Sequence, residues 1–197
     1  MKRAIFGGSF NPIHLDHIRL ALAFASQFSL DRVTLIPTHL TPLKDNSAIA
    51  DGRHRLMMCR LAAQDYPVLE VSDIELRRQG MSYTSDTLSA YVGRGDELYL
   101  IVGADMYLTL DRWHEFRYLF ENATILVAPR DELDYDSLSE KYKEYQAYRC
   151  RTLFLPCGVG ALSSTSVRAV LSRGGSAAGM LDGRVEDYIR RHGLYSA

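Results

Sequence analysis

The residues best suited to chemistry lie near the start of the 197-residue chain, in the stretch "GGSFNPIHLDH". It follows a short apolar run and contains His14 and His17. At the start of a helix, side chains at positions i and i+3 share one face and can hold one group together. Glycines at the carboxyl end of a parallel strand allow close approach to a phosphate, and a helix start offers unpaired N–H groups. The stretch therefore predicts a site for an anion.

The histidine pair has two other interpretations. Two histidines at a helix start can simply cap it or pack there. They can also bind a metal ion, but two more ligands are needed, and no nearby cysteine or second histidine cluster supplies them. The stretch is neither Gly-x-Gly-x-x-Gly nor a P-loop, which excludes those two nucleotide fingerprints. Because Gly-Gly-Ser-Phe-Asn-Pro precedes the histidines, the pair is best explained as a phosphate-binding site.

A second helix start with polar side chains occurs at "SSTSVR". Ser163 or Ser164 is the expected N-cap, and Thr165 follows in the first turn. Hydroxyl groups and unpaired N–H groups there can bind phosphate, and Arg168 adds a fork of donors about one turn later. Taken alone, this segment would be an ordinary capped helix with a surface arginine.

Apolar runs alternate with helical patterns along the chain. The expected strands are Ala4–Phe6, Val33–Ile36, Val68–Val71, Leu98–Val102, Ile125–Ala128 and Thr152–Leu155. The expected helices are Leu15–Phe28, Asp51–Asp65, Ser85–Val92 and Trp113–Phe120, with a further helix over "VEDYIRR" capped by Gly193. This rhythm predicts an α/β fold, a doubly wound parallel sheet with a C-terminal helical segment. We expect one domain over residues 1–197.

Net charge and composition indicate which classes of partner and which cell compartment to expect. The formal net charge is −1, so no overall field favours nucleic acid or a membrane. The absence of a signal peptide or long apolar run, and an odd count of three cysteines, fit a cytoplasmic protein. The polar segment Asp131–Tyr148 predicts a surface helix; a contact with a second copy, forming a homo-oligomer, is the alternative.

Six motifs in order resemble bacterial nicotinate-nucleotide adenylyltransferases of the HxGH nucleotidyltransferase superfamily. Besides the opening stretch they are "PTHLTPLK", "DGRHRLMMCRLA", "SYTSDTL", "VGADMYLTLDRWHEF" and "LSSTSVR". The resemblance covers nearly the whole chain. It implies a Rossmann-like fold and transfer of AMP from ATP to nicotinate mononucleotide, giving nicotinate adenine dinucleotide and pyrophosphate in NAD biosynthesis. It also implies Mg²⁺ bound through the ATP phosphates.

The resemblance assigns an ATP site. His14 and His17 donate hydrogen bonds to the phosphates, and Lys44 and Arg168 add charge. Without the motif, Lys44 would be an ordinary solvated loop lysine. Asp105 is expected near the adenosine ribose, with a helix-capping role as its alternative. The remaining ATP-binding candidates are Gly7, Gly8, Ser9, Phe10, Gly103, Ser164 and Thr165.

The resemblance also assigns an acceptor pocket for nicotinate mononucleotide. Backbone N–H groups of Thr84 and His114 bind the nicotinate carboxylate, and no basic side chain is assigned to it. Trp113, which would otherwise be a core residue, stacks on the pyridine ring. Asp86 either belongs to this pocket or only caps a helix. Ser9 and Lys44 lie where the two nucleotides meet.

One residue departs from the motif, because Asp16 replaces the glycine before the second histidine. A carboxylate suits a helix start but repels a triphosphate. We therefore expect it to point away from the phosphates, in which case Asp16→Gly preserves activity. The alternatives for the whole chain are pantetheine-phosphate adenylyltransferase, a cytidylyltransferase, and a non-catalytic nucleotide-binding regulator.

Overall fold

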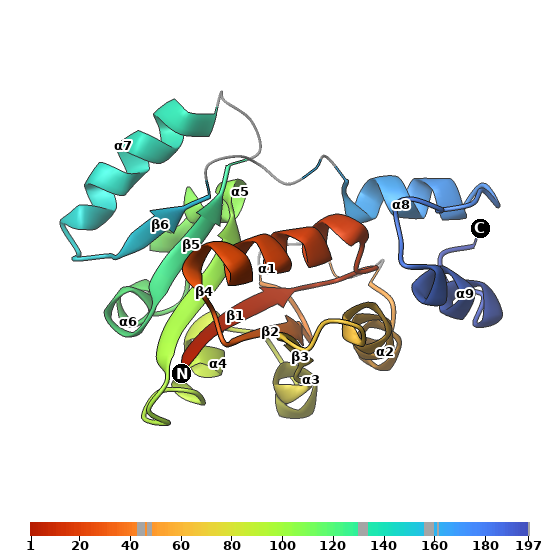
Figure 1. Cartoon of the computed structure of the whole chain (residues 1–197), viewed down its shortest axis with the longest axis horizontal. Helices are drawn as coiled ribbons and strands as arrows, with labels where there is room; N and C mark the ends of the chain where they lie inside the picture. Colours follow the sequence, from red (N-terminus) through yellow and green to blue (C-terminus); the bar gives the residue numbers. More distant parts are fainter. Residues whose placement is uncertain (43–45, 47–48, 130–133, 156–159, 161, 197) are drawn as a thin grey trace.

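A six-stranded parallel sheet forms the centre of the molecule (Figure 1). The computed structural model describes residues 1–42, 46, 49–129, 134–155, 160 and 162–196. The strand order is β3-β2-β1-β4-β5-β6. The strands are β1 (Lys2–Gly8), β2 (Arg32–Pro37), β3 (Leu69–Val71), β4 (Glu97–Gly103), β5 (Thr124–Ala128) and β6 (Thr152–Phe154). Every expected strand is present, and the Rossmann-like, doubly wound parallel sheet is confirmed.

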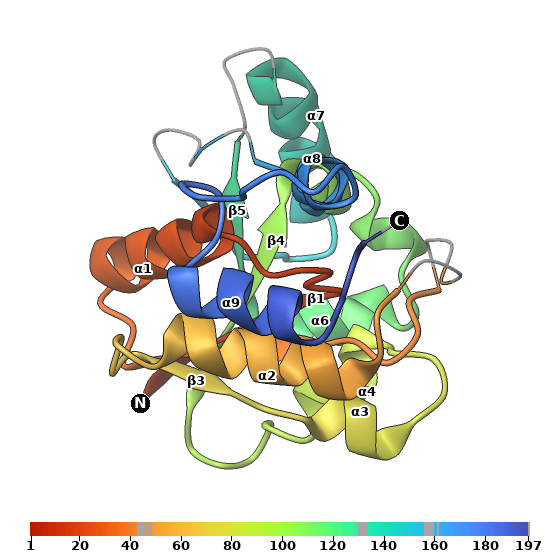
Figure 2. The same ribbon diagram turned by 90° about the vertical axis from the view of Figure 1, so that its right-hand side faces the viewer.

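Helices cover both faces of this sheet (Figures 1 and 2). They are α1 (Leu15–Phe28), α2 (Gly52–Ala63), α3 (Ile74–Arg78), α4 (Thr84–Ser89), α5 (Ala104–Tyr107), α6 (Phe116–Asn122), α7 (Asp134–Gln146), α8 (Ser164–Leu171) and α9 (Gly183–Arg191), with a 3₁₀ turn, η1, at Leu110–Arg112. The prediction for α1 is confirmed to the residue. The helix expected from Trp113 begins only at Phe116, because Glu115 adopts a left-handed backbone with φ 51°. The short helices α3 and α5 were not predicted.

The alternation of side chains along the strands divides the core into two layers. Ala4 and Phe6 of β1 face one layer, which contains buried residues of α1, α2, α8 and α9. Ile5 faces the other layer, which is closed by α4, α5, α6 and α7. Both faces of the strands are therefore buried, as expected for a parallel sheet. Cys59 and Cys150 are buried thiols within these layers.

The helix α7 is present as expected for the polar segment, yet it is anchored to the core. Tyr145 is 1% exposed, and its hydroxyl donates to the carbonyl of Tyr107 at 2.9 Å. Leu138 is buried beside it. This helix therefore packs on α5, at the end of the molecule opposite α8 and α9 (Figure 1). The contact with a second copy stays a prediction.

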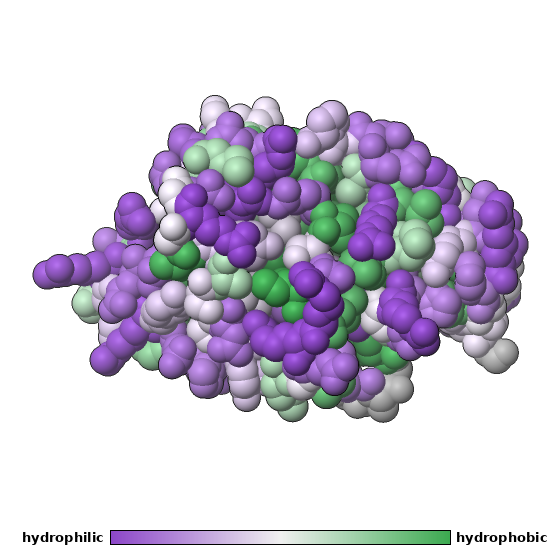
Figure 3. All heavy atoms as spheres, turned by 90° about the horizontal axis from the view of Figure 1, so that it is seen from below, coloured by the Kyte–Doolittle hydropathy of each residue, from purple (hydrophilic) through white to green (hydrophobic). Residues whose placement is uncertain are grey.

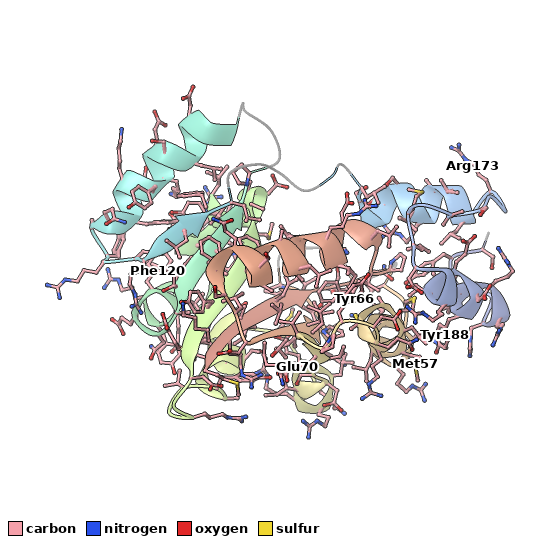
Figure 4. The ribbon with its side chains drawn as sticks, in the orientation of Figure 1. Met57, Tyr66, Glu70, Phe120, Arg173 and Tyr188 are labelled. Atoms are coloured by element: carbon pink, nitrogen blue, oxygen red, sulfur yellow. The ribbon has the colours of Figure 1, made fainter. Side chains whose placement is uncertain are left out.

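The C-terminal helix α9 lies against α2 (Figure 2). Tyr188 of α9 reaches towards α2, where its hydroxyl is 2.8 Å from Nδ1 of His54 (Figure 4). Gly193 follows the helix with φ 58°, the left-handed conformation expected for a glycine after a helix end. The face of the molecule on which α2, α3 and α4 lie is mainly polar, with hydrophobic residues towards its centre (Figure 3). No helix among the described residues is long and apolar enough to cross a bilayer.

Candidate active site

A large cavity opens where the direction of strand connection reverses, between β1 and β4. Chain order runs outward from β1 to β3 on one side and from β4 to β6 on the other. Ligands of open α/β sheets bind at such points, beyond the carboxyl ends of the strands. The cavity has a volume of about 580 Å³. Its walls include the ends of β1 and β4 and the starts of α1, α4 and α8.

The loop after β1 is shaped by the ring of Phe10. Phe10 is 2% exposed and has a left-handed backbone with φ 44°. Its ring packs edge-on against the rings of Phe6 and His17, at centroid distances of 5.5 and 5.1 Å. A Cβ atom at Gly8 would meet this ring at 3.2 Å, whereas Gly7 has open space around it. Gly8 thus makes room for the packing that holds the loop, and Gly7 borders the cavity.

The two histidines are stacked at the start of α1. Their ring centroids are 3.6 Å apart, and both rings line the cavity. The backbone N–H of His14 donates to Nδ1 of His17 at 3.2 Å. Because Nδ1 of His17 is the acceptor in this bond, a neutral ring carries its proton on Nε2. Nε2–H of His17 is then a hydrogen-bond donor.

Burial lowers the pKa of His14 to about 4, with only partial compensation from the charge of Asp16. His14 is 6% exposed. An unfolded histidine has a pKa near 6.5, so neutral His14 contributes stability above about pH 6.5, and this contribution is lost progressively as the pH falls towards 4. His14 is therefore neutral at pH 7.

We expect the free energy of unfolding to fall by about 2 kcal/mol between pH 7 and pH 5 through His14 alone. The His14→Gln variant, which has no titratable group at this position, should show a smaller decrease over the same range. Urea unfolding of both proteins at several pH values measures the difference. Parallel curves for the two proteins would contradict the assignment of a depressed pKa to His14.

The start of α8 lies against the loop before α1. Ser163 is the N-cap, and its hydroxyl accepts from the N–H of Ser166 at 3.0 Å. The Ser164 hydroxyl donates to the carbonyl of Pro12 at 2.9 Å. Arg168 Nη1 donates to the carbonyl of Asn11 at 2.8 Å. Two helix starts, about 150 positions apart in the sequence, thus share one end of the cavity.

The opposite side of the cavity is formed by the start of α4 and the segment after η1. Thr84 is the first residue of α4, where backbone N–H groups lack intrahelical partners. Trp113 packs against the core layer of α4 to α7 and also lines the cavity. Its Nε1 is buried and has no hydrogen-bond partner among the residues that the structure describes. The His114 ring stacks on Tyr83 at a centroid distance of 4.4 Å.

Comparison with known proteins identifies the family. Residues 5–170 match the family model described as cytidylyltransferase-like. The chain belongs to this family. A probable nicotinate-nucleotide adenylyltransferase of Desulfatibacillum aliphaticivorans is 35% identical over 99% of this chain and 100% of its own length. One from Bordetella petrii is 37% identical over 99% of this chain and 100% of its length. The recognition of the nicotinate-nucleotide adenylyltransferases from sequence motifs is thus confirmed.

Solved structures share the fold of this chain. The nicotinic acid mononucleotide adenylyltransferase of Plasmodium falciparum complexed with NaAD superposes with a TM-score of 0.75 at 17% identity. The superposition covers 99% of this chain and 98% of that one. A putative nicotinate-nucleotide adenylyltransferase from Vibrio parahaemolyticus gives a TM-score of 0.67 at 19% identity, covering 99% and 96% of the two chains.

Most of the residues singled out in the sequence line this one cavity. They are Gly7, Gly8, Ser9, Phe10, His14, His17, Thr84, Gly103, Trp113, His114, Ser164, Thr165 and Arg168. Asp105 and Asp86 are not among the lining residues. Gly103 and Tyr83, not these aspartates, are the N-caps of α5 and α4, so neither aspartate is a helix N-cap. Lys44 lies outside the described residues.

Arg112 is a basic residue that the sequence argument did not assign. It lies at the end of η1, directly before Trp113, and lines the cavity together with Trp113 and His114. Its guanidinium is therefore a donor group for an anion on this side, besides the backbone N–H groups.

Arg55 is a functional candidate that the sequence analysis missed. Its side chain on α2 is 2% exposed, and Nη1 donates to the carbonyl of Ser9 at 2.8 Å, while Nε donates to the carbonyl of Ala50. Burial lowers the pKa of this guanidinium. A signal existed, because Arg55 shares helical spacing with the buried residues Met58 and Cys59. Arg55 therefore holds the loop after β1 in place.

Tyr195 provides a second support for this loop that sequence periodicity did not reveal. Its hydroxyl donates to Oδ1 of Asn11 at 2.7 Å. The same oxygen accepts from the N–H of Ala50 at 3.1 Å. Asn11, in the motif, is thereby tied both to the segment before α2 and to the residues after α9.

Proposed function

We propose that this chain transfers AMP from ATP to nicotinate mononucleotide, producing nicotinate adenine dinucleotide and pyrophosphate. Its membership among the nicotinate-nucleotide adenylyltransferases supports this activity. The observation that carries the proposal is the shared cavity: the starts of α1 and α8 border it from one side, and Thr84 and Trp113 border it from the other. A nucleoside triphosphate and a nucleotide with an aromatic base can therefore meet at the carboxyl end of β1.

The chemistry requires positioning more than proton transfer. A phosphate monoester has a second pKa near 6, so the phosphate of the acceptor is largely ionised at pH 7 and is already a nucleophile. One of its oxygens forms a bond to the α-phosphorus of ATP. The bond from that phosphorus to the bridging oxygen breaks, and pyrophosphate leaves with the electron pair. Catalysis then depends on alignment and on stabilising charge on the departing group.

The chain offers several donors for this task. His17 can donate from Nε2–H, because its Nδ1 accepts a hydrogen bond from the backbone N–H of His14. Arg168, in the second half of α8, supplies a guanidinium whose Nη1 already lies 2.8 Å from the carbonyl oxygen of Asn11. Both act on phosphate oxygens in this proposal. The starts of α1 and α8 add partial positive charge where negative charge accumulates.

Lys44 and Mg²⁺ add positive charge at the phosphates. Lys44, which follows β2 in the sequence, contributes a point charge to the phosphates. Mg²⁺ keeps much of its water shell and commonly binds through substrate phosphates, so it enters with ATP and offsets phosphate charge. Among the described residues, no group of three or more His, Cys, Asp or Glu side chains is arranged to hold a metal ion.

A pyrophosphate-release assay tests the function directly. The purified chain is incubated with ATP and Mg²⁺ and, separately, with nicotinate mononucleotide, nicotinamide mononucleotide, phosphopantetheine or a phosphorylated alcohol. We expect the fastest release with nicotinate mononucleotide. Faster release with phosphopantetheine, or with CTP replacing ATP, would assign another transferase activity. No release with any pair would make the chain a nucleotide-binding regulator.

A further inference from the structure

Asp16 occupies the position between the two histidines, and its carboxylate is fully engaged. The side chain is 6% exposed. Oδ2 accepts a hydrogen bond from the backbone N–H of Leu162 at 2.9 Å, and Oδ1 accepts from Nη1 of Arg19 at 2.8 Å. Leu162 precedes the N-cap of α8, whereas Asp16 is in the first turn of α1. The carboxylate therefore joins the two helix starts that border the phosphate side of the cavity.

Gly160 provides an independent observation on the same contact. A Cβ atom built at Gly160 would lie 1.9 Å from Oδ2 and 2.5 Å from Oδ1 of Asp16. The carboxylate thus fills the space that any other residue at position 160 needs. The two positions are matched: an aspartate on α1 goes together with a glycine before α8.

Among the described residues, three hydrogen bonds join α8 and the residue before its N-cap to the region from Asn11 to Asp16, and their acceptors differ. Ser164 and Arg168 are donors in two of them. Phosphate oxygens compete for donors of this kind, so these two links can be exchanged when a triphosphate binds. The backbone N–H of Leu162 is also a donor, but its acceptor is the Asp16 carboxylate, and a phosphate oxygen that competed for this N–H would be repelled by that negative charge. The bond between Leu162 and Asp16 is therefore the link that a bound triphosphate displaces least readily.

We propose that Asp16 is a positioning residue that fixes the start of α8 relative to α1, so that both meet the triphosphate at the correct separation. Arg19 balances its charge, and the bond to Leu162 directs the carboxylate to the loop before α8. This inference rests on the proposed function. It replaces the expectation, drawn from the motif alone, that Asp16→Gly leaves activity unchanged.

Three variants test the link. In Asp16→Gly, the N–H of Leu162 loses its acceptor, and we expect the KM for ATP to rise about 10-fold, as for loss of one charge-assisted hydrogen bond. The KM for the acceptor should stay within about twofold, because the acceptor side is formed by other elements. Asp16→Asn keeps an acceptor oxygen for Leu162 and should restore most of the ATP affinity. Arg19→Gln removes only the ion pair and should behave like the wild type.

Two further measurements separate positioning from general loss of structure. Hydrogen exchange at the amide of Leu162 should be slow in the wild type and in Asp16→Asn, and faster in Asp16→Gly. In a double-mutant cycle, Gly160→Ala should raise the KM for ATP in the wild type, but add little in Asp16→Gly, where the carboxylate is absent. The strain of alanine at a φ of 71° is common to both backgrounds and cancels.

The outcomes are distinguishable. A wild-type KM for ATP in folded Asp16→Gly, or an additive cycle with Gly160→Ala, would overturn the proposal. So would an Asp16→Asn variant as impaired as Asp16→Gly, since the charge rather than the bond to Leu162 would then matter. If the wild-type chain itself transferred no AMP, the proposed function would fail instead, while the exchange rate of the Leu162 amide would still report the structural link.

Discussion

The His17→Ala variant is expected to lower kcat on the order of 100-fold or more, with a much smaller change in the KM for ATP. The backbone N–H of His14 donates to Nδ1 of His17, which assigns the proton to Nε2. Stacking on His14 and edge contact with Phe10 hold the ring in place. A donor fixed before the reaction stabilises charge that develops on the phosphates without reorganising first.

The measurement is steady-state kinetics with varied ATP at saturating acceptor, together with thermal unfolding to verify the fold. His192→Ala is the matched control, since His192 lies on the exposed end of α9 and outside the cavity lining. It should retain the wild-type kcat. A folded His17→Ala protein with unchanged kcat would remove His17 from the transition state. A rise confined to the KM for ATP would restrict it to binding.

Nicotinate mononucleotide is expected to be a better acceptor than nicotinamide mononucleotide by about 5- to 150-fold in kcat/KM. This range corresponds to about 1–3 kcal/mol for one buried donor left without an acceptor. The N–H of Thr84 lies at the start of α4, and the backbone of His114 borders the same side of the cavity. An N–H group can only donate, so the amide NH₂ of the wrong acceptor faces a donor, whereas both carboxylate oxygens accept.

Arg112 offers a second source of the same preference, and one variant separates the two. Arg112→Gln removes the guanidinium and leaves the backbone of α4 and of His114 in place. If N–H groups carry the selectivity, the variant should retain most of the preference for the acid. A ratio near one in Arg112→Gln would assign the selectivity to the guanidinium. Equal kcat/KM values for the two acceptors in the wild type would show that the carboxylate pocket lies elsewhere.

Local sequence patterns determined the secondary structure and the identity of the phosphate-binding segments. Apolar alternation and helical spacing predicted all six strands, and α1 to the residue, because each depends on interactions within a few positions. The spacing of His14 and His17 placed both on one face for the same reason. Where the backbone departs from regular geometry, as at Glu115 with φ 51°, the helix begins later than predicted. Short helices such as α3 lack enough turns for a periodic signal.

The tertiary structure alone decided how these segments meet. The start of α8 contacts the loop before α1 although α8 follows β6, which lies at the edge of the sheet, and no local pattern encodes that contact. The contact between Asp16 and Leu162 joins residues 146 positions apart. Arg55 turns inward, where the carbonyls of Ala50 and Ser9 accept its hydrogen bonds. Short-range periodicity specifies elements, whereas partners for buried polar groups are set by long-range packing.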